Sequence, residues 1–519
     1  MRSMPILVAL LSAQAATADE LNLAGRTAGP RAAEVGSIQQ FGDLRPGDWA
    51  YQALANLIER YGCISGTPAG SLAGQRSITR FEAAALLNAC LERVADVSDE
   101  LKALMAALEP ERTLLQGRTT ALEAKVGVLE SQSFSTTTTL KGKANLVLGG
   151  VGFSGSAIDA ASNTVATASQ GPLPLTNAVS FNYDVRLTFD TSFNGSDLLR
   201  TELRAGDFDS ASNSYGGGGP TPLGTLEVAF QEQSGRNSLG LYKLYYQAPL
   251  GAGFTATAGG MVAQEDMLAF WPSVYPDSTV LDVMTMAGAP LAYNYNRGPG
   301  AGLWWKHQGW SISASYVAAS GALGSPNAGG IGTAHASSTA TVQLAHEQDG
   351  WGLALAYAGV QNGAAPYGTN ALLDRINSPG SFSNALALSG YWQPAKAGWI
   401  PSISAGWGTA VTNSSNPASA GTPLTSQSWS VGLQWLDVLA NGNSAGLAFG
   451  QAPFITAQSD GGSPDDGNWM WELWTKLQVT DSISVTPALL YLSRPLGQET
   501  PAGQGFNQWG ALIKTTLIF

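Results

Sequence analysis

Charged residues and long apolar runs are both scarce in this chain. Only 12% of its 519 residues are Asp, Glu, Lys or Arg, whereas about a quarter of an ordinary soluble domain is charged. No stretch approaches the roughly 18 unbroken apolar residues that a membrane-spanning helix requires. Low charge without such a helix favours a strand barrel that alternates an apolar face with a polar one.

Residues that carry chemistry are equally few. His307, His335 and His346 are the only histidines, and the sequence has no serine, histidine and acid in a recognisable catalytic spacing. It also lacks a phosphate-binding loop and a metal-ligating cluster, so we expect no enzyme activity, no cofactor and no metal site. The net charge of −12 argues against nucleic acid as a partner.

The N-terminal residues 1–18 have the pattern of a secretory signal peptide. Arg2 precedes the apolar segment 5–11, and Ala16 and Ala18 form a small-x-small cleavage site. The alternative is an unstructured N-terminus. A signal peptide implies export into an oxidising compartment.

Cysteine is scarce as well, since Cys63 and Cys90 are the only two. In an oxidising periplasm they can pair, and a disulfide closing a loop of that size stabilises a fold by about 2–4 kcal/mol. The alternative is a pair of buried small apolar side chains. The sequence leaves both open.

The segment 509–519 alternates like a strand with one apolar face. One face carries Trp509, Ala511, Ile513, Thr515, Leu517 and Phe519, and the other carries Lys514. Eleven residues is about the length of a tilted strand that crosses a bilayer. A chain that ends on such a strand with Phe resembles a bacterial outer-membrane β-barrel, although a half-buried strand of a soluble sandwich alternates too.

Fifteen further segments alternate in the same way, and aromatic residues gather near their ends as in interfacial girdles. The segment 179–190 is the clearest, with Phe181 and Val185 on one face and Asp184 and Arg186 on the other. The sixteen predicted strands are 140–149, 179–190, 198–206, 239–248, 253–262, 299–307, 310–318, 338–347, 351–359, 383–393, 399–409, 427–435, 444–451, 469–478, 482–493 and 507–519. They predict an all-β transmembrane barrel over 135–519.

The segment 223–233 is a further strand candidate. If it is a barrel strand, two short connections follow one another. If it lies within a loop, long and short connections alternate throughout, as they do in outer-membrane barrels with long external loops and short periplasmic turns. We therefore assign it to the second external loop. Both ends of the barrel are then periplasmic.

A barrel of sixteen strands encloses an aqueous lumen. Arg or Lys facing lipid at mid-depth costs about 2–4 kcal/mol, so the charged side chains of the strands should face water. They either set selectivity or pair with one another. The side chains predicted to line the lumen are Lys141, Lys143, Asp184, Arg186, Arg200, Glu202, Arg204, Lys243, Glu472, Lys476 and Lys514.

Two long loops are candidates for a constriction. The loop 263–298 lies between the fifth and sixth strands, where general porins fold a loop into the lumen. It carries Glu265, Asp266, Asp277, Asp282 and Arg297. Its rival is the loop 207–238, which contains Glu227. Acidic loops favour cations at the mouth, and the inner arginines can reverse that preference deeper in.

The segment 38–95 has the pattern of two helices. Thr79 and Glu82 form a capping box at the start of the second. The sequences F-G-D-L at 41–44, W-A at 49–50 and I-T-R-F-E at 78–82 resemble an S-layer homology (SLH) domain. The resemblance implies a wall-polysaccharide site of Asp43, Trp49, Arg80 and Glu82. The alternative is that Arg80 and Glu82 only cap and pair, and Gly66-Thr67-Pro68 departs from the usual Gly-Tyr-Pro.

The segment 96–132 has a seven-residue leucine column, which is typical of a coiled coil. The column is Val94, Leu101, Leu108, Leu115, Leu122 and Leu129. The second seam is polar and Pro110 interrupts it, so a single amphipathic helix is the alternative. S-layer proteins usually carry three wall-binding motifs, and a trimeric coil would bring three together. We therefore expect a homotrimer.

This order of SLH motif, coil and barrel resembles the cyanobacterial outer-membrane porins, whose barrel is related to the carbohydrate-selective OprB type and whose members are often called iron-uptake porins. The resemblance implies passive diffusion of inorganic ions and small hydrophilic solutes through an outer-membrane barrel. It also implies a tether from the periplasmic SLH domain to peptidoglycan-linked polysaccharide. The alternative is a mainly structural tether with a largely closed barrel, which conductance across a bilayer would distinguish.

Overall fold

The computed structural model describes residues 52–53, 83–84, 87, 99–111, 113, 137–159, 162–276, 280–364, 366–413, 424–459, 462 and 464–519. The chain divides into two compact units, Met1–Ser133 and Phe134–Phe519.

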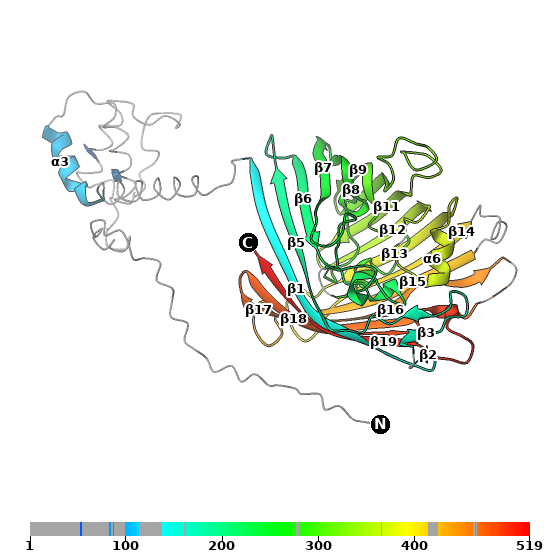
Figure 1. Ribbon diagram of the computed structural model, residues 1–519. Coiled ribbons are helices and arrows are strands. Elements are labelled where there is room, and N and C mark those ends of the chain that lie inside the picture. Colours follow the sequence, from blue (N-terminus) through cyan, green and yellow to red (C-terminus); the bar gives the residue numbers. More distant parts are fainter. Residues whose placement is uncertain are drawn as a thin grey trace, which may run out of the picture. The chain divides into compact units, whose positions relative to one another are not determined.

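The second unit is a closed barrel of 16 antiparallel strands (Figure 1). Consecutive strands pair around the barrel, and β1 closes it by pairing with both β5 and β19. The strands are β1 (Thr138–Ser154), β5 (Ser180–Thr191), β6 (Leu198–Gly206), β7 (Leu239–Gly251), β8 (Phe254–Ala263), β9 (Arg297–His307), β10 (Trp310–Ala318), β11 (Ser338–Gln348), β12 (Trp351–Gln361), β13 (Phe382–Trp392), β14 (Ser402–Asn413), β15 (Leu424–Leu436), β16 (Ser444–Gln458), β17 (Trp469–Thr480), β18 (Ile483–Ser493) and β19 (Asn507–Ile518).

These strands confirm the predicted all-β barrel, and each predicted segment overlaps one of them. The segment 223–233 is not a barrel strand. Its first residues belong to the 3-10 turn η3 (Pro222–Gly224), and Leu226 forms an isolated bridge with Leu281 of another loop. Reading it as part of a long connection was therefore correct.

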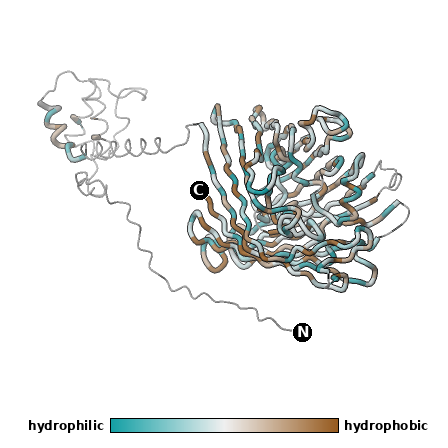
Figure 2. The backbone as a smooth tube through the Cα atoms, viewed as in Figure 1, coloured by the Kyte–Doolittle hydropathy of each residue, from teal (hydrophilic) through white to brown (hydrophobic). Residues whose placement is uncertain are grey.

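Hydrophobic and hydrophilic residues alternate along the barrel strands (Figure 2). On β17 the outward side chains Trp471 and Leu473 are exposed, whereas Glu472 and Trp474, which alternate with them, are buried. The exposed face is therefore the apolar one, as expected for strands that meet lipid.

Connections alternate between short and long around the barrel. Residues 308–309 alone join β9 to β10, and 481–482 join β17 to β18, whereas 264–296 separate β8 from β9. The first long connection holds a small sheet of β2 (Ile158–Asp159), β3 (Thr164–Val165) and β4 (Leu173–Pro174). Thr138 at the start of β1 pairs with Thr191 beside the short turn after β5, and Lys143 pairs with Ile518 at the end of β19. Both ends of the barrel therefore lie at the edge that carries the short turns.

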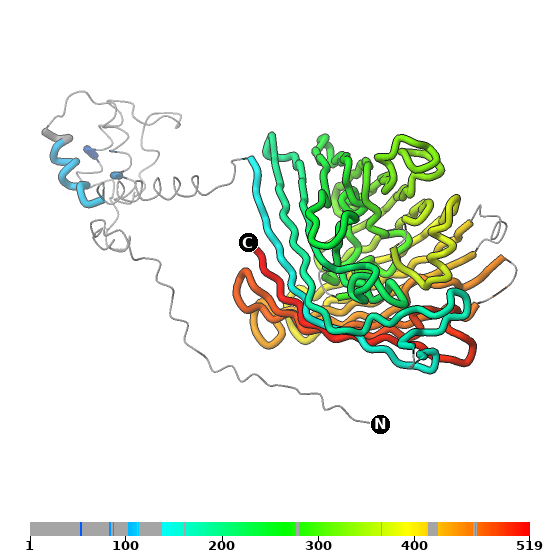
Figure 3. The backbone as a smooth tube through the Cα atoms, viewed as in Figure 1, coloured from blue at the N-terminus to red at the C-terminus, as the bar shows by residue number. Residues whose placement is uncertain are grey.

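Two long loops fold into the barrel (Figure 3). The loop after β6 contains η2 (Ser214–Gly216) and η3, and the loop after β8 contains η4 (Gln264–Met267) and α5 (Asp282–Thr285). The second of these packs Leu291, Tyr293 and several alanines against inward alanines of β12 and β13. Outer loops add α6 (Asn370–Ile376) and η5 (Gly497–Glu499).

In the first unit the longest described element is α3 (Asp99–Ala107). It ends three residues before Pro110, and a short helical turn follows. Leu104 and Leu108 are both buried. Among the described helices, none has the length and apolar content needed to cross a membrane.

Several predictions fall on residues outside those that the structure describes. They are the signal peptide 1–18, most of the coil 96–132, the wall-binding set Asp43, Trp49, Arg80 and Glu82, the cysteines Cys63 and Cys90, and Asp277. They stay predictions.

Candidate functional site

A cavity of about 510 Å³ lies between one side of the barrel wall and the two inward loops. Strands β5, β6 and β7 supply the wall, and both candidate constriction loops contribute to the lining. The charged lining residues are Arg186, Glu202, Arg204, Glu227, Lys243, Glu265, Asp282 and Arg297, and the aromatic ones are Phe230, Tyr242, Trp271 and Tyr295. Positive and negative side chains therefore meet in one space.

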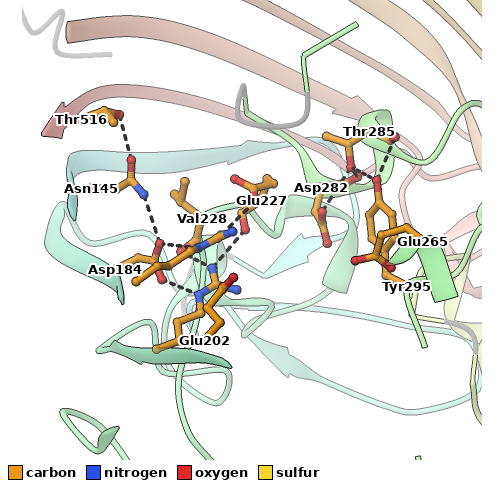
Figure 4. A network of polar contacts seen from close by, with 12 residues as sticks. Asn145, Asp184, Glu202, Glu227, Val228, Glu265, Asp282, Thr285, Tyr295 and Thr516 are labelled. Carbon is orange, nitrogen blue, oxygen red and sulfur yellow. Dashed lines mark hydrogen bonds and ion pairs between the residues drawn. The ribbon is translucent and has the colours of Figure 1, made fainter. Parts of the chain in front are cut away.

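Two arginines of neighbouring strands share one buried carboxylate on the wall. Arg204 Nε lies 2.5 Å from Asp184 Oδ1, and Arg186 Nε lies 3.2 Å from Asp184 Oδ2. Asn145 donates to the same carboxylate at 3.1 Å, and Thr516 donates to Asn145 at 2.8 Å (Figure 4). The chain of contacts runs across β19, β1, β5 and β6, and it fixes both guanidinium groups.

The loop 207–238 brings an acid to these arginines. Arg186 Nη2 lies 2.9 Å from Glu227 Oε1, and Arg204 Nη2 donates to the carbonyl of Val228 at 3.3 Å (Figure 4). Burial alone would raise the pKa of Glu227, but the positive charges of Arg186, Lys143, Arg204 and Lys514 hold that pKa at about 2. Glu227 is therefore ionised at neutral pH.

A bulge in β7 places an aromatic ring among the arginines. Glu202 pairs with Lys243 and Leu203 pairs with Leu241, so Tyr242 is the extra residue. The Cζ atoms of Arg297, Arg204 and Arg186 lie 3.7, 4.6 and 5.9 Å from the centroid of the Tyr242 ring. These distances are within the range of cation–π attraction.

The loop 264–296 supplies acids to the lysine beside this ring. Lys243 Nζ lies 2.8 Å from Asp266 Oδ1 and 3.2 Å from Glu265 Oε1. Asp266 Oδ2 also accepts the backbone N–H of Ala263 at 3.1 Å, which fixes η4 at the end of β8. The start of this loop is thereby held against the wall.

Asp282 is a buried acid of the same loop. Tyr367 donates to its Oδ2 at 2.8 Å, and Thr285 donates to its Oδ1 at 3.4 Å. Burial raises the pKa of Asp282 to about 7, and the negative charge of Glu227 adds to the shift. Asp282 therefore titrates near neutral pH inside the cavity.

Comparison with known proteins adds the family. A family model described as "Carbohydrate-selective porin, OprB family" matches residues 101–507, and one described as "S-layer homology domain" matches residues 40–84. The chain belongs to the OprB family of porins. The protein is thus an outer-membrane porin and not an enzyme, as the resemblance implied.

Relatives of this porin occur in cyanobacteria. An uncharacterized protein of Nostoc sp. is 30% identical over 534 residues, which cover 94% of this chain and 86% of that one. An uncharacterized protein of Synechocystis sp. is 28% identical, over 94% and 91% of the two chains. A solved structure of Pseudomonas putida OprB shows 10% identity and a TM-score of 0.49, over 76% of this chain and 97% of that chain.

In this porin the structure corrects the placement of Glu472, which we expected along the open lumen. Glu472 faces inward, but its side chain has no exposed surface. Its carboxylate accepts the hydroxyl of Tyr275 and the backbone N–H of Leu281, both at 2.6 Å, and Trp474 donates to Tyr275 at 2.7 Å. Glu472 thus contacts the middle of the loop 264–296.

The other predicted residues divide between the cavity and more distant places. Arg186, Glu202, Arg204, Lys243, Glu265, Asp282 and Arg297 line the cavity, and Asp266 pairs with Lys243 beside it. Arg200 binds Asp190 at 2.7 Å, and Lys141 binds the same carboxylate at 3.1 Å, near the short turn after β5. Lys476 lies on the inward side of β17 but not in the cavity lining.

Sequence reasoning missed Tyr242, because alternation counted from the inward Lys243 points the neighbouring Tyr242 toward lipid. The available signal was weak: Tyr242 and Lys243 are two consecutive polar residues between the outward leucines Leu241 and Leu244, a pattern that is consistent with a bulge.

Proposed function

We propose that this porin passes inorganic ions and small hydrophilic solutes by passive diffusion through the cavity between its charged wall and its two inward loops. The observation that supports the proposal is the lining itself. Four cationic and four acidic side chains face one space of about 510 Å³ inside a barrel whose outer face is apolar. Such a lining replaces part of the hydration of a polar solute.

The charge arrangement favours weak selectivity between cations and anions. Acids of the two loops pair with cations of the wall, since Glu227 binds Arg186 and both Glu265 and Asp266 bind Lys243. The loop acids therefore compensate the arginines locally, and we expect no strong field of one sign along the path.

We further propose that the SLH domain lies in the periplasm and binds peptidoglycan-linked polysaccharide. The shared short-turn edge of the two barrel ends supports this orientation, because short turns face the periplasm in outer-membrane barrels. The wall-binding residues would be Asp43, Trp49, Arg80 and Glu82. Loss of sedimentation with purified cell wall in Arg80→Ala, but not in the barrel variants below, would support the tether.

A homotrimer is part of the same proposal, since one SLH motif per chain and the leucine column favour three chains together. Mass measurement in mild detergent tests it, and a monomeric mass would contradict it. A largely closed tether is the second candidate function. The dense packing of the loop 264–296 against the wall favours that alternative.

Conductance across a planar bilayer separates the two candidates. We expect stable single-channel currents in KCl from the purified porin. A preparation that binds cell wall but passes no current would establish the closed tether instead.

Substitution of Glu227 tests whether the cavity is the path. Glu227→Gln removes the charge that compensates Arg186 and leaves two arginines facing the cavity, so the reversal potential in a KCl gradient should shift toward anions several-fold in permeability ratio. Glu347→Gln is the matched control, because its pair with Lys306 is largely solvent-exposed and neither residue lines the cavity. Equal reversal potentials in both variants would exclude the cavity from the path.

A further inference from the structure

Three of the charged side chains that line the cavity form no ion pair among the residues that the structure describes, namely Arg297, Glu202 and Asp282. Among the residues that the structure describes, Arg186, Arg204 and Lys243 each form an ion pair, whereas Arg297 forms none. Glu202 likewise has no ion pair among the described residues. Both oxygens of Asp282 accept hydrogen bonds, from Tyr367 and Thr285, so Arg297 and Glu202 are the cation and the acid that remain available to a solute.

Arg297 is held without being neutralised. Its guanidinium carbon lies 3.7 Å from the centroid of the Tyr242 ring, so the planar group is close to the ring face. A guanidinium in that position keeps its N–H groups for a carboxylate, which it can bind with two parallel hydrogen bonds. The bulge that turns Tyr242 inward thus supplies a platform for an anion-binding group.

Glu202 is buried and incompletely bonded. Its residue is 9% exposed, its Oε1 atom has no hydrogen-bond partner, and its Oε2 atom accepts only a long bond of 3.4 Å from Thr188. Its cross-strand neighbour Lys243 turns instead to Glu265 and Asp266. A buried carboxylate oxygen without a donor is unfavourable, so a cationic donor that enters the cavity gains by binding there.

We propose that the cavity binds a small zwitterionic solute, with its carboxylate on Arg297 and its ammonium on Glu202. This inference rests on the proposed channel function. A neutral solute compensates neither charge and a monovalent ion compensates only one, whereas an amino acid compensates both. The volume of about 510 Å³ also leaves room for accompanying water, since a water molecule occupies about 30 Å³.

The test is block of the single-channel KCl current by added solutes. Glycine, β-alanine and γ-aminobutyrate form a series with increasing separation of the two charges. Acetate, propionate and butyrate are matched carboxylates without ammonium, and glycerol is a neutral control. We expect at least one amino acid to block at a half-block concentration about tenfold below that of its matched carboxylate, because the carboxylate lacks the charge-assisted hydrogen bond to Glu202.

Variants then locate the two charges. Arg297→Gln and Glu202→Gln should each raise the half-block concentration of the best amino acid about tenfold, and the double variant should add little to either single one. Lys476→Gln, on the inward side of β17 outside the cavity, should leave block unchanged.

Equal block by amino acid and matched carboxylate in the unaltered porin overturns the inference, as does unchanged block in both single variants. If a variant does not assemble into a barrel, the solute series on the unaltered porin decides alone. Absence of any KCl current contradicts the proposed function, whereas current without amino-acid block contradicts only this inference.

Discussion

Opposite sides of the barrel wall differ in the size and charge of their inward side chains. On β5, β6 and β7 the inward residues include Asp184, Arg186, Glu202, Arg204 and Lys243. On β11 to β15 they are mainly alanine, serine and threonine, and most of them are buried. The charged side retains a cavity, whereas the side with small residues is covered by a loop.

The small residues allow the loop 264–296 to lie directly on the wall. Ser389 donates to the carbonyl of Ala287 at 2.7 Å, and Ser428 donates to that of Gly288 at 3.0 Å. Ser404 Oγ accepts the backbone N–H groups of Val274 and Tyr275 at 2.9 and 3.0 Å. Hydroxyls on one wall thus satisfy loop backbone that would otherwise be buried without partners.

The charged side requires counter-charges in addition to backbone contacts, because removing unpaired charges from water is costly. The loops meet it with side chains of opposite charge, as Glu227 does with Arg186. The shape of the lumen therefore depends on two kinds of wall. The wall of small residues packs directly against loop backbone, whereas the charged wall requires water or side chains of opposite charge.

The largest expected effect comes from making the small-residue wall bulky. The inward Gly406 is in direct contact with the carbonyl of Ala287, so any side chain there displaces the loop. Because the loop lies between this wall and the cavity, Gly406→Leu should push it toward the charged wall, lower single-channel conductance several-fold and cost about 1–3 kcal/mol of stability. The control is Ala405→Leu on the same strand, which faces outward. Unchanged conductance in Gly406→Leu would mean that the loop does not limit the current.

A smaller effect is expected from removing the hydrogen bonds between Glu472 and the middle of the loop 264–296. Glu472→Gln leaves one oxygen for two donors, Tyr275 and Leu281, and one buried donor without a partner costs about 1–3 kcal/mol. We expect larger current fluctuations at nearly the same mean conductance. Lys476→Gln on the same strand is the control. Recordings as quiet as those of the unaltered porin would argue against an anchoring role.

The smallest effect is a pH dependence within the charged cavity. Asp282 has a pKa of about 7, so raising the pH through 7 adds one negative charge to the lining and should increase cation permeability modestly. Because the folded state holds this proton and an unfolded carboxyl releases it near pH 4, this group makes stability fall as pH rises from about 4 to 7.

Reversal potentials between pH 6 and 8 measure the permeability change, and Asp282→Asn should abolish it. Asp209→Asn is the control, since hydrogen bonds from the backbone of Ala211 and from Ser212 lower the pKa of Asp209. If the reversal potential of Asp282→Asn still changed between pH 6 and 8, another group would be responsible for the titration.

Much of the barrel was predictable because lipid imposes a two-residue period. The alternation around Phe181 and Trp471 located strands, and the rhythm of connections placed 223–233 in a loop. The cavity was predictable in part, since charges such as Arg186 and Arg204 cannot face lipid. Their shared partner Asp184 follows from the register of neighbouring strands.

What remained hidden depends on tertiary packing. Glu472 has the inward parity of a pore-lining residue, and only the path of a distant loop shows that it is covered. Tyr242 was missed because a bulge changes the alternation at one residue. The pKa of Asp282 is raised by burial and by the negative charge of Glu227 from another loop, neither of which the local sequence shows.

Tyr242, the extra residue in β7, can be added to or removed from the lining without changing the faces of its neighbours. On either side of Tyr242, Leu241 and Leu244 point outward and Lys243 points inward, so removing the tyrosine would restore an uninterrupted amphipathic ribbon. A lineage could therefore gain or lose the aromatic platform by a single codon insertion or deletion, while every remaining side chain of the strand keeps its face.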